Sequence, residues 1–111
     1  MLFTYELERR LKGTNVDVNA VDPGGVATGL GSDQLLFRIL VKLPILKTPE
    51  KGASTAIYLA SAPELTGVTG KYFANSKQRS SSKLSYDEKL AQELWDVSAR
   101  MTGLAATARA A

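Results

Sequence analysis

Two short strand-forming segments with a helix-forming segment between them constrain the fold of this 111-residue chain most. Val16–Val21 is β-branched and alternating, Lys71–Ala74 contains two aromatic residues, and Thr48–Ala62 has helical spacing. Two strands joined through a helix pair in parallel, with a right-handed connection. Because parallel sheets normally have further strands and both faces covered, two such strands alone make a poor structure. The sequence therefore predicts an α/β fold with an incomplete sheet that lacks its upstream strands.

Further helix-forming segments surround these strands. An amphipathic helix ends at Gly13, a helix over Asp33–Leu43 is apolar nearly all round, and a terminal helix covers Tyr86–Met101. Thr48 followed by Pro and Glu is a helix start, and Ser85 with Glu three residues later forms a capping box. The apolar faces predicted to be buried are Phe3, Leu7 and Leu11; Ala53, Ala56, Ile57 and Ala60; and Leu90, Leu94, Val97 and Met101.

Composition removes several classes of chemistry. The chain has no cysteine and no histidine, which excludes thiol nucleophiles, disulfides, imidazole bases and the usual zinc sites within it. Its chemistry must use hydroxyls, carboxylates, lysines, backbone amides or a bound cofactor. The net charge is +3 without a long basic run, so nucleic acid is not an expected partner. The stretch Leu35–Leu46 is too short and too charged to span a bilayer.

The segment Val18–Thr28 carries the most chemical information, because its first strand ends in the turn Asp22–Gly25. In open α/β sheets, ligands bind beyond the carboxyl ends of the strands. Glycines in such a turn let the backbone approach a flat ring or a phosphate closely, since no Cβ intervenes. The spacing fits neither a G-x-G-x-x-G fingerprint nor a P-loop. From spacing alone, a plain structural turn stays the favoured interpretation.

The turn also resembles the Pro-Gly motif that follows the sixth strand of short-chain dehydrogenases/reductases. Other segments are similar to that family, in the same order along the chain. They are Leu2–Leu7, like the helix after the family's catalytic tyrosine and lysine; Lys47–Ala53, like the start of its next helix; Thr69–Phe73, like its seventh strand; and Leu94–Ser98 with Thr102–Leu104, like the tail of the retinol-dehydrogenase-like branch. The resemblance covers residues 2–104. It implies a partial doubly wound Rossmann-type fold, with the last two parallel strands and their helices.

Under this resemblance the chain divides into three parts. Residues 1–75 are expected to form the carboxy-terminal portion of a dinucleotide-binding α/β domain. Residues 76–104 are expected to form a basic loop over Ser76–Lys83 and the terminal helix. Residues 105–111 are mostly alanine and are expected to be a frayed tail.

The resemblance implies a partial site for NAD or NADP. Pro23 and Gly24 would shape the wall beside the nicotinamide ring. The backbone of Val26 would hydrogen-bond the carboxamide, and Thr28 would bind the carboxamide or the neighbouring phosphate. Asp22 departs from the branch, which often has histidine before the Pro-Gly pair, and is not expected to be catalytic.

The apolar helix that begins at Leu35 lies where the family places its substrate lid. Leu35, Leu36 and Ile39 are therefore candidate substrate-binding residues. A core helix under the sheet is an equally weighted alternative for the same segment.

No catalytic residue is predicted within the chain. The family's Gly-rich turn, its NAD/NADP selector, its catalytic serine and its tyrosine-lysine pair are all expected upstream. Each tyrosine here lacks the lysine four positions later that the family uses. Such a tyrosine keeps a pKa near ~10 and is a poor proton donor at neutral pH. Asn19 is expected to stabilise the strand end rather than react.

The first functional hypothesis is a carboxy-terminal fragment of an NAD(P)-dependent oxidoreductase that acts on alcohol or carbonyl groups, with lipophilic substrates such as retinoids. Partners of the complete enzyme would be small alcohols, aldehydes or ketones, while peripheral membrane contact and a homo-oligomer stay open. The alternative is a non-catalytic truncated chain that binds a partner through its exposed strand edge. A membrane-surface module is the weakest hypothesis. Met1–Lys12 does not resemble a signal or transit peptide.

Overall fold

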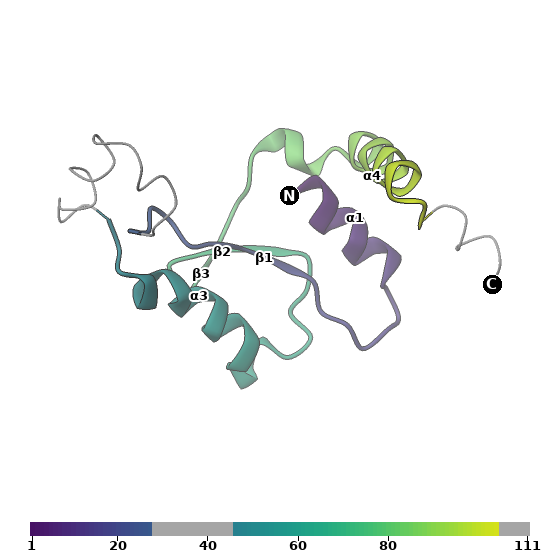
Figure 1. Ribbon diagram of the computed structural model, residues 1–111. Coiled ribbons are helices and arrows are strands. Elements are labelled where there is room, and N and C mark those ends of the chain that lie inside the picture. Colours follow the sequence, from purple (N-terminus) through teal and green to yellow (C-terminus); the bar gives the residue numbers. More distant parts are fainter. Residues whose placement is uncertain (28–45, 105–111) are drawn as a thin grey trace, which may run out of the picture. The chain divides into compact units, whose positions relative to one another are not determined.

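The computed structural model describes residues 1–27 and 46–104 of the chain (Figure 1). The predicted helix over Asp33–Leu43 and the predicted tail over 105–111 lie outside the described residues. The observed elements are α1 (Leu2–Arg10), β1 (Asn19–Asp22), α3 (Pro49–Ser61), β2 (Lys71–Ala74), β3 (Lys77–Arg79) and α4 (Glu88–Thr102), with 3₁₀ turns at Pro63–Leu65 and Lys83–Tyr86. The predicted α/β class is thus confirmed.

The strands form one sheet in the order β1-β2-β3. The hydrogen bonds that lead into β1 and β2 advance in the same direction along both segments, as a parallel pair requires. The Gly67 N–H donates to the Asp17 carboxylate at 2.9 Å. The Gly70 N–H donates to the Val18 carbonyl at 2.7 Å, and the Lys71 N–H donates to the Asn19 side-chain oxygen at 3.0 Å. The predicted pairing of the two strands across a helical connection is therefore confirmed.

The strand β1 begins at Asn19, and not at Val16 as predicted, and it includes Asp22. The reason lies in side-chain bonds that replace the backbone ladder. The Val18 N–H donates to the Thr69 hydroxyl oxygen at 2.9 Å, where a ladder would use a carbonyl. The Asn19 side chain donates to the Val68 carbonyl at 2.6 Å, which agrees with its predicted structural role.

The segment predicted as a polar loop over Ser76–Lys83 contains the strand β3, so that prediction was wrong in part. β3 pairs with β2 in an antiparallel register, with Phe73 opposite Gln78. The connecting residues Asn75 and Ser76 have φ of 53° and 54°. Two positive φ values in succession are typical of the type I′ turn, which fits the twist of a tight hairpin. Because all three residues of β3 are polar and exposed, hydrophobic alternation gave no signal for it.

The chain forms two compact units. Unit 1 contains Met1–Ala20, Gly67–Lys71 and Ser80–Ala111, and unit 2 contains Val21–Thr66 and Tyr72–Arg79. These units are clusters of contacts within this chain. The predicted division into 1–75, 76–104 and 105–111 concerns the domains of a larger fold and stays a prediction.

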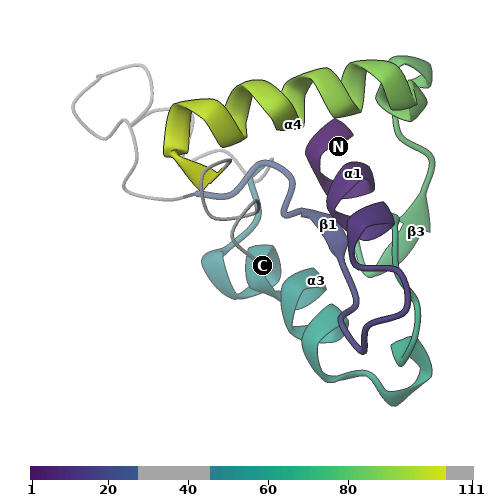
Figure 2. The same cartoon turned by 90° about the vertical axis from the view of Figure 1, so that its right-hand side faces the viewer.

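In unit 1, α1 packs against α4 (Figure 2). Aromatic and small residues make this contact. The Phe3 and Trp95 rings stack with centroids 4.8 Å apart, and the Arg10 guanidinium lies 4.5 Å from the Trp95 ring centroid. Ala91 and Ala99 are the buried residues of α4. The predicted face was wrong, because Leu94, Val97 and Met101 are exposed. The small alanines let α1 approach closely, and Trp95 supplies the contact area.

Glu6 is the buried residue of α1, although the apolar spacing of this helix predicts that it faces solvent. It is 3% exposed and accepts hydrogen bonds from Arg9 at 2.7 Å and from Arg10 at 2.6 Å. Burial pushes the pKa of Glu6 upward, but the bonds and charges of the two arginines outweigh it and leave the pKa below its ordinary value. A carboxylate can therefore be buried here because two guanidinium groups satisfy it.

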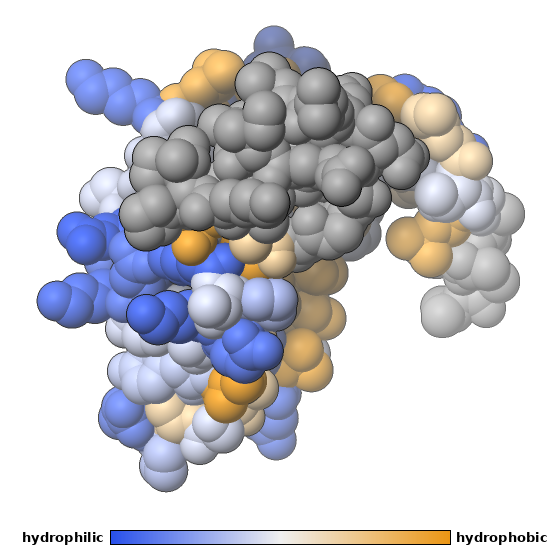
Figure 3. Space-filling model, turned by 60° about the vertical axis from the view of Figure 1, so that its left-hand side comes forward, coloured by the Kyte–Doolittle hydropathy of each residue, from blue (hydrophilic) through white to orange (hydrophobic). Residues whose placement is uncertain are grey.

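In unit 2, α3 buries Gly52 and Thr55 rather than the predicted stripe of Ala53, Ala56, Ile57 and Ala60. Ile57 is 60% exposed. The Thr55 hydroxyl accepts a hydrogen bond from the Ser76 N–H at 3.0 Å, so α3 faces the hairpin turn with a polar group. Figure 3 shows hydrophobic surface in orange beside hydrophilic surface on the side of the molecule that it faces. The apolar stripe of α3 therefore does not mark its buried face. A hydrogen bond of Thr55 and the close approach allowed by Gly52 determine which face is buried.

The two predicted helix starts had different outcomes. Thr48 caps α3 as predicted, accepting from the Lys51 N–H at 3.3 Å, with Pro49 at the first helical position. The cap of α4 is Asp87, which accepts from the Leu90 N–H at 3.0 Å. Ser85 is instead buried and donates its hydroxyl to the Ser82 carbonyl at 2.6 Å. The predicted capping box was therefore wrong, since an aspartate two residues later is an equally good cap.

Candidate functional site

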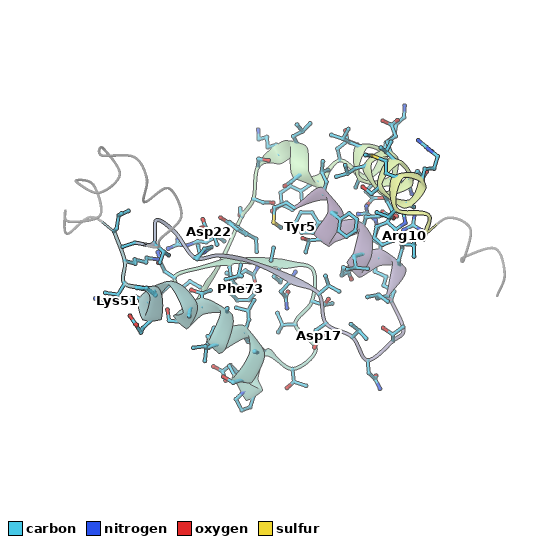
Figure 4. All side chains as sticks on the ribbon, in the orientation of Figure 1. Tyr5, Arg10, Asp17, Asp22, Lys51 and Phe73 are labelled. Carbon is cyan, nitrogen blue, oxygen red and sulfur yellow. The ribbon has the colours of Figure 1, made fainter. Side chains whose placement is uncertain are left out.

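The turn that follows β1 in unit 2 is closed by a side chain at the strand end. One carboxylate oxygen of Asp22 accepts a hydrogen bond from the Gly24 N–H at 2.7 Å. The other accepts from the Tyr72 hydroxyl of β2 at 2.8 Å. Gly24 has φ of 72°, which a residue with Cβ rarely adopts. Asp22 thus fixes the shape of the turn. Figure 4 labels Asp22 beside this turn.

These bonds change the acidity of both partners. The Gly24 N–H, the Tyr72 hydroxyl and the charge of Lys47 hold the pKa of Asp22 below its ordinary value. The hydrogen bond to Asp22, with partial desolvation, raises the pKa of Tyr72. Asp22 therefore remains a carboxylate at neutral pH, and Tyr72 remains a protonated phenol that donates to it.

Lys47, which the sequence analysis did not single out, joins the turn at several points. Its backbone forms a parallel bridge with Val26. The Lys47 N–H donates to the Gly25 carbonyl and the Lys47 carbonyl accepts from the Ala27 N–H, both at 2.9 Å. Its ammonium donates to the Pro23 carbonyl at 3.1 Å and to the Asn75 side-chain oxygen at 2.5 Å. No periodicity marks such a residue, and its place directly before Thr48 was the only available signal.

The glycines of the turn and of α3 have close neighbours. A Cβ on Gly24 would lie 2.9 Å from the Lys47 ammonium nitrogen, and a Cβ on Gly25 would lie 3.1 Å from the Leu46 side chain. A Cβ on Gly52 would lie 2.5 Å from a methyl carbon of Val26. The side chain of Val26 therefore packs directly on the backbone of α3, and its position depends on a glycine there.

The backbone of Val26 faces away from Lys47. In a parallel bridge, one residue makes both hydrogen bonds, to the two neighbours of the residue opposite. Here Lys47 makes both bonds, so the N–H and C=O of Val26 point away from Lys47. Among residues 1–27 and 46–104 these two groups meet no hydrogen-bond partner. A donor and an acceptor on one residue match the two hydrogen-bonding groups of a primary carboxamide. The described part of the turn therefore fits the group that the resemblance assigns to it.

The structure brings three of the predicted cofactor-binding residues together in unit 2, namely Pro23, Gly24 and Val26. The fourth, Thr28, lies outside the described residues, as do the predicted substrate-binding residues Leu35, Leu36 and Ile39. A hollow of about 410 Å³ lies beside the turn. It is lined by Lys47, Lys51, Ser54, Asn75 and Ser76.

The four tyrosines of the chain differ in the direction of their pKa shifts. Burial raises the pKa of Tyr5 and of Tyr58, as the bond to Asp22 does for Tyr72. Tyr86 differs, because hydrogen bonds with Ser81 lower its pKa. The described residues also include no group of three acidic side chains that could hold a metal ion. None of their helices is long and apolar enough to cross a membrane.

The geometry defines a class of protein. A strand, a helical connection and a neighbouring strand, with a glycine turn beyond the end of the first strand, are the arrangement of an α/β fold, and in such folds ligands bind beyond the carboxyl ends of the strands. No protein-family model matches the chain. Several individual proteins are nevertheless similar to it in sequence.

The chain is 48% identical over 110 residues to retinol dehydrogenase 14 of Homo sapiens, covering 94% of this chain and 33% of that protein. It is 43% identical over 110 residues to polyprenol dehydrogenase of Homo sapiens, with coverages of 94% and 33%. It is 43% identical over 114 residues to retinol dehydrogenase 13 of Homo sapiens, with coverages of 96% and 34%. The chain is therefore similar to the carboxy-terminal part of these retinol and polyprenol dehydrogenases, which are members of the short-chain dehydrogenase/reductase family.

The chain spans about a third of the length of the curated relatives it matches. Those relatives are oxidoreductases, which supports the broader part of the functional hypothesis, an oxidoreductase fragment. The alternative of a non-catalytic chain that acts through a partner receives no support from them.

Proposed function

We propose that this chain forms the nicotinamide-facing part of an NAD(P)-dependent oxidoreductase that acts on lipophilic alcohols or their carbonyl counterparts. In that enzyme its strands would be the last two parallel strands of a doubly wound Rossmann-type sheet. The observation that carries the proposal is the turn after β1, inside a region of high identity to named dehydrogenases. Since 94% of the chain is matched to retinol dehydrogenase 14, the turn lies within the matched region.

The proposed roles follow the geometry of the turn. Pro23 and Gly24 form the wall beside the nicotinamide, where the lack of a Cβ on Gly24 allows a flat ring to approach. The N–H and C=O of Val26 hold the carboxamide and so fix which face of the ring is presented. Thr28 adds a hydroxyl donor to the carboxamide or the neighbouring phosphate. When bound, the nicotinamide supplies the hydride acceptor or donor.

The substrate class comes from the names of the relatives. Retinol and polyprenol are the alcohols named for them. Leu35, Leu36 and Ile39 are proposed to contact the apolar part of such an alcohol, because an apolar surface excludes water from a lipophilic chain. Peripheral membrane contact and a homo-oligomer also remain proposals for the complete enzyme.

The proton donor is assigned to the part of the relatives that this chain does not match. Tyr72 is unsuited to the role because its hydroxyl is held by Asp22 and its pKa is raised. The contribution of this chain is therefore to orient the ring and to shape the substrate side.

A chimaera tests the proposal. This chain would replace the matching carboxy-terminal third of human retinol dehydrogenase 14, and retinal-dependent oxidation of NADPH would be followed by absorbance. We expect turnover, and we expect Val26→Pro, which removes the N–H, to raise the KM for NADPH. Val26→Ala is the matched control, because it shortens the side chain but keeps the N–H. A chimaera that melts like its parent and shows no turnover would contradict the proposal.

A further inference from the structure

The ammonium of Lys47 ties together two segments of unit 2 that are distant in sequence. It donates to the Pro23 carbonyl in the turn after β1 and to the Asn75 side chain at the end of β2, at 3.1 and 2.5 Å. Asn75 itself has a positive φ of 53° in the hairpin turn. One cation therefore links the two turns at the ends of neighbouring strands.

Both acceptors are neutral, although the donor is charged. Within the described residues Lys47 takes part in no salt bridge, and the nearby Asp22 carboxylate is engaged by Gly24 and Tyr72. Hydrogen bonds from a charged donor are shorter and stronger than neutral ones. The ammonium therefore acts on the turn through directed bonds to Pro23 and Asn75.

The backbone and side chain of Lys47 have separable roles. The bonds to Gly25 and Ala27 use the Lys47 backbone, so any residue except proline could make them. The bond to Pro23 uses the side chain alone, and the ammonium also fills the space beside Gly24, where a Cβ would lie 2.9 Å away. A substitution of the side chain can thus loosen the turn while the backbone bridge persists.

We propose that Lys47 is a positioning residue for the nicotinamide-facing turn. Its ammonium fixes the Pro23 carbonyl against β2 and thereby holds the Val26 N–H and C=O toward the carboxamide. Lys47 itself does not touch the cofactor. The inference rests on the proposed function for the identity of the ligand, but the ordering of the turn by Lys47 stands on the contacts of this chain alone.

The test uses NMR on the full 111-residue chain, with Lys47→Met as the main variant. Methionine keeps most of the length of the side chain and removes the charge and the donors. We expect faster amide exchange at Ala27 and Gly24 without ligand. In titrations with NADPH followed at the Val26 amide, we expect roughly tenfold weaker binding, the effect of losing about one charge-assisted hydrogen bond. Lys47→Arg should restore most of the affinity, because it again donates to both acceptors.

Lys51→Met is the matched control, since Lys51 lines the same hollow but forms no bond to the turn from its side chain. It should leave exchange and NADPH affinity at wild-type values. Asn75→Asp is the second variant if Lys47→Met does not fold. A carboxylate acceptor should strengthen the tie and slow exchange at Ala27.

The outcomes separate the two claims. Unchanged exchange in Lys47→Met, or equal loss of affinity in Lys51→Met and Lys47→Met, overturns the positioning role. A chimaera with retinol dehydrogenase 14 that melts like its parent and shows no turnover overturns the proposed function instead. Faster exchange at Ala27 in the Lys47→Met variant would then still establish that Lys47 orders the turn.

Discussion

The turn of unit 2 and the helix pair of unit 1 are held by different forces. The turn between Asp22 and Ala27 depends on directed hydrogen bonds and on glycines with close neighbours. The pair α1 and α4 depends on stacked rings, a guanidinium over Trp95 and two buried alanines. Directed bonds fix an orientation, whereas ring and alkyl contacts mainly supply stabilising area.

This difference matters for function. A ligand that is recognised by backbone N–H and C=O groups needs those groups at a fixed angle, and the bonds of Asp22 and Lys47 supply that angle. The helix pair leaves Leu94, Val97 and Met101 exposed, so its contribution is to stability and surface rather than to orientation. Substitutions in the two regions should therefore separate binding geometry from stability.

The largest effect is expected from Gly52→Val in unit 2. The first added carbon would lie 2.5 Å from a Val26 methyl carbon, and the helix backbone cannot yield easily. Overpacking of this kind costs about 3 kcal/mol in the free energy of unfolding. Urea denaturation would measure the loss, with Ala53→Val on the exposed face of α3 as control. Equal losses in both variants would mean that the contact with Val26 is not the cause.

A smaller loss is expected from Trp95→Ala in unit 1. The change removes the stack on Phe3 and the cation–π contact with Arg10. Since Trp95 is only partly buried, we expect about 2 kcal/mol, below the value for a core tryptophan. The amide exchange of Ala27 relative to global unfolding should stay unchanged. A changed amide exchange of Ala27 in this variant would contradict the idea that the turn and the helix pair are held independently.

The buried carboxylate of unit 1 predicts a dependence of stability on pH. The folded pKa of Glu6 is lowered, so its stabilising contribution is present above the ordinary pKa of 4.5 and is lost as pH falls through the folded value. Glu6→Gln should cost about 1 kcal/mol at neutral pH, because the amide oxygen still accepts from one arginine while its NH₂ group cannot accept from the other. It should also flatten the stability profile below pH 4.5. Chemical denaturation at several pH values, with exposed Glu93→Gln as control, would check this.

The sequence predicted the elements better than their contacts. The strand Lys71–Ala74 and the start of α3 at Thr48 came out as expected, because aromatic strand residues and a Thr-Pro cap are local signals. The buried faces of α3 and α4 did not. Periodicity ranks side chains by hydrophobicity, whereas these faces are chosen by small size at Gly52 and Ala91, which permits close approach.

The candidate site shows the same contrast between local features, which the sequence predicts, and contacts between distant segments, which it does not. The turn at Pro23 and Gly24 was predicted because turn residues have a recognisable local chemistry, whereas the binding roles of these residues came from the resemblance and stay a prediction. Lys47 and Asn75 were missed because their bonds join segments that are distant in sequence. The strand β3 was also not predicted. Its hairpin is marked only by the pair Asn75 and Ser76, both of which have positive φ. Tertiary hydrogen bonds of this kind leave no periodic trace in a single sequence.

The smallest effect is expected from Asp22→Asn, which tests whether the turn needs a charge or only an acceptor. The amide oxygen of asparagine can still accept from the Gly24 N–H, and its NH₂ can donate to the Tyr72 oxygen, so both contacts survive with the second reversed. Stability at neutral pH should therefore change less than in Glu6→Gln. The clear change should be in acidity. The pKa of Tyr72 is raised mainly by its bond to the carboxylate, so it should return toward its ordinary value of 10.0 in the variant. An NMR titration of the Tyr72 ring would measure this, and a pKa that stays raised would show that Asp22 is not its cause.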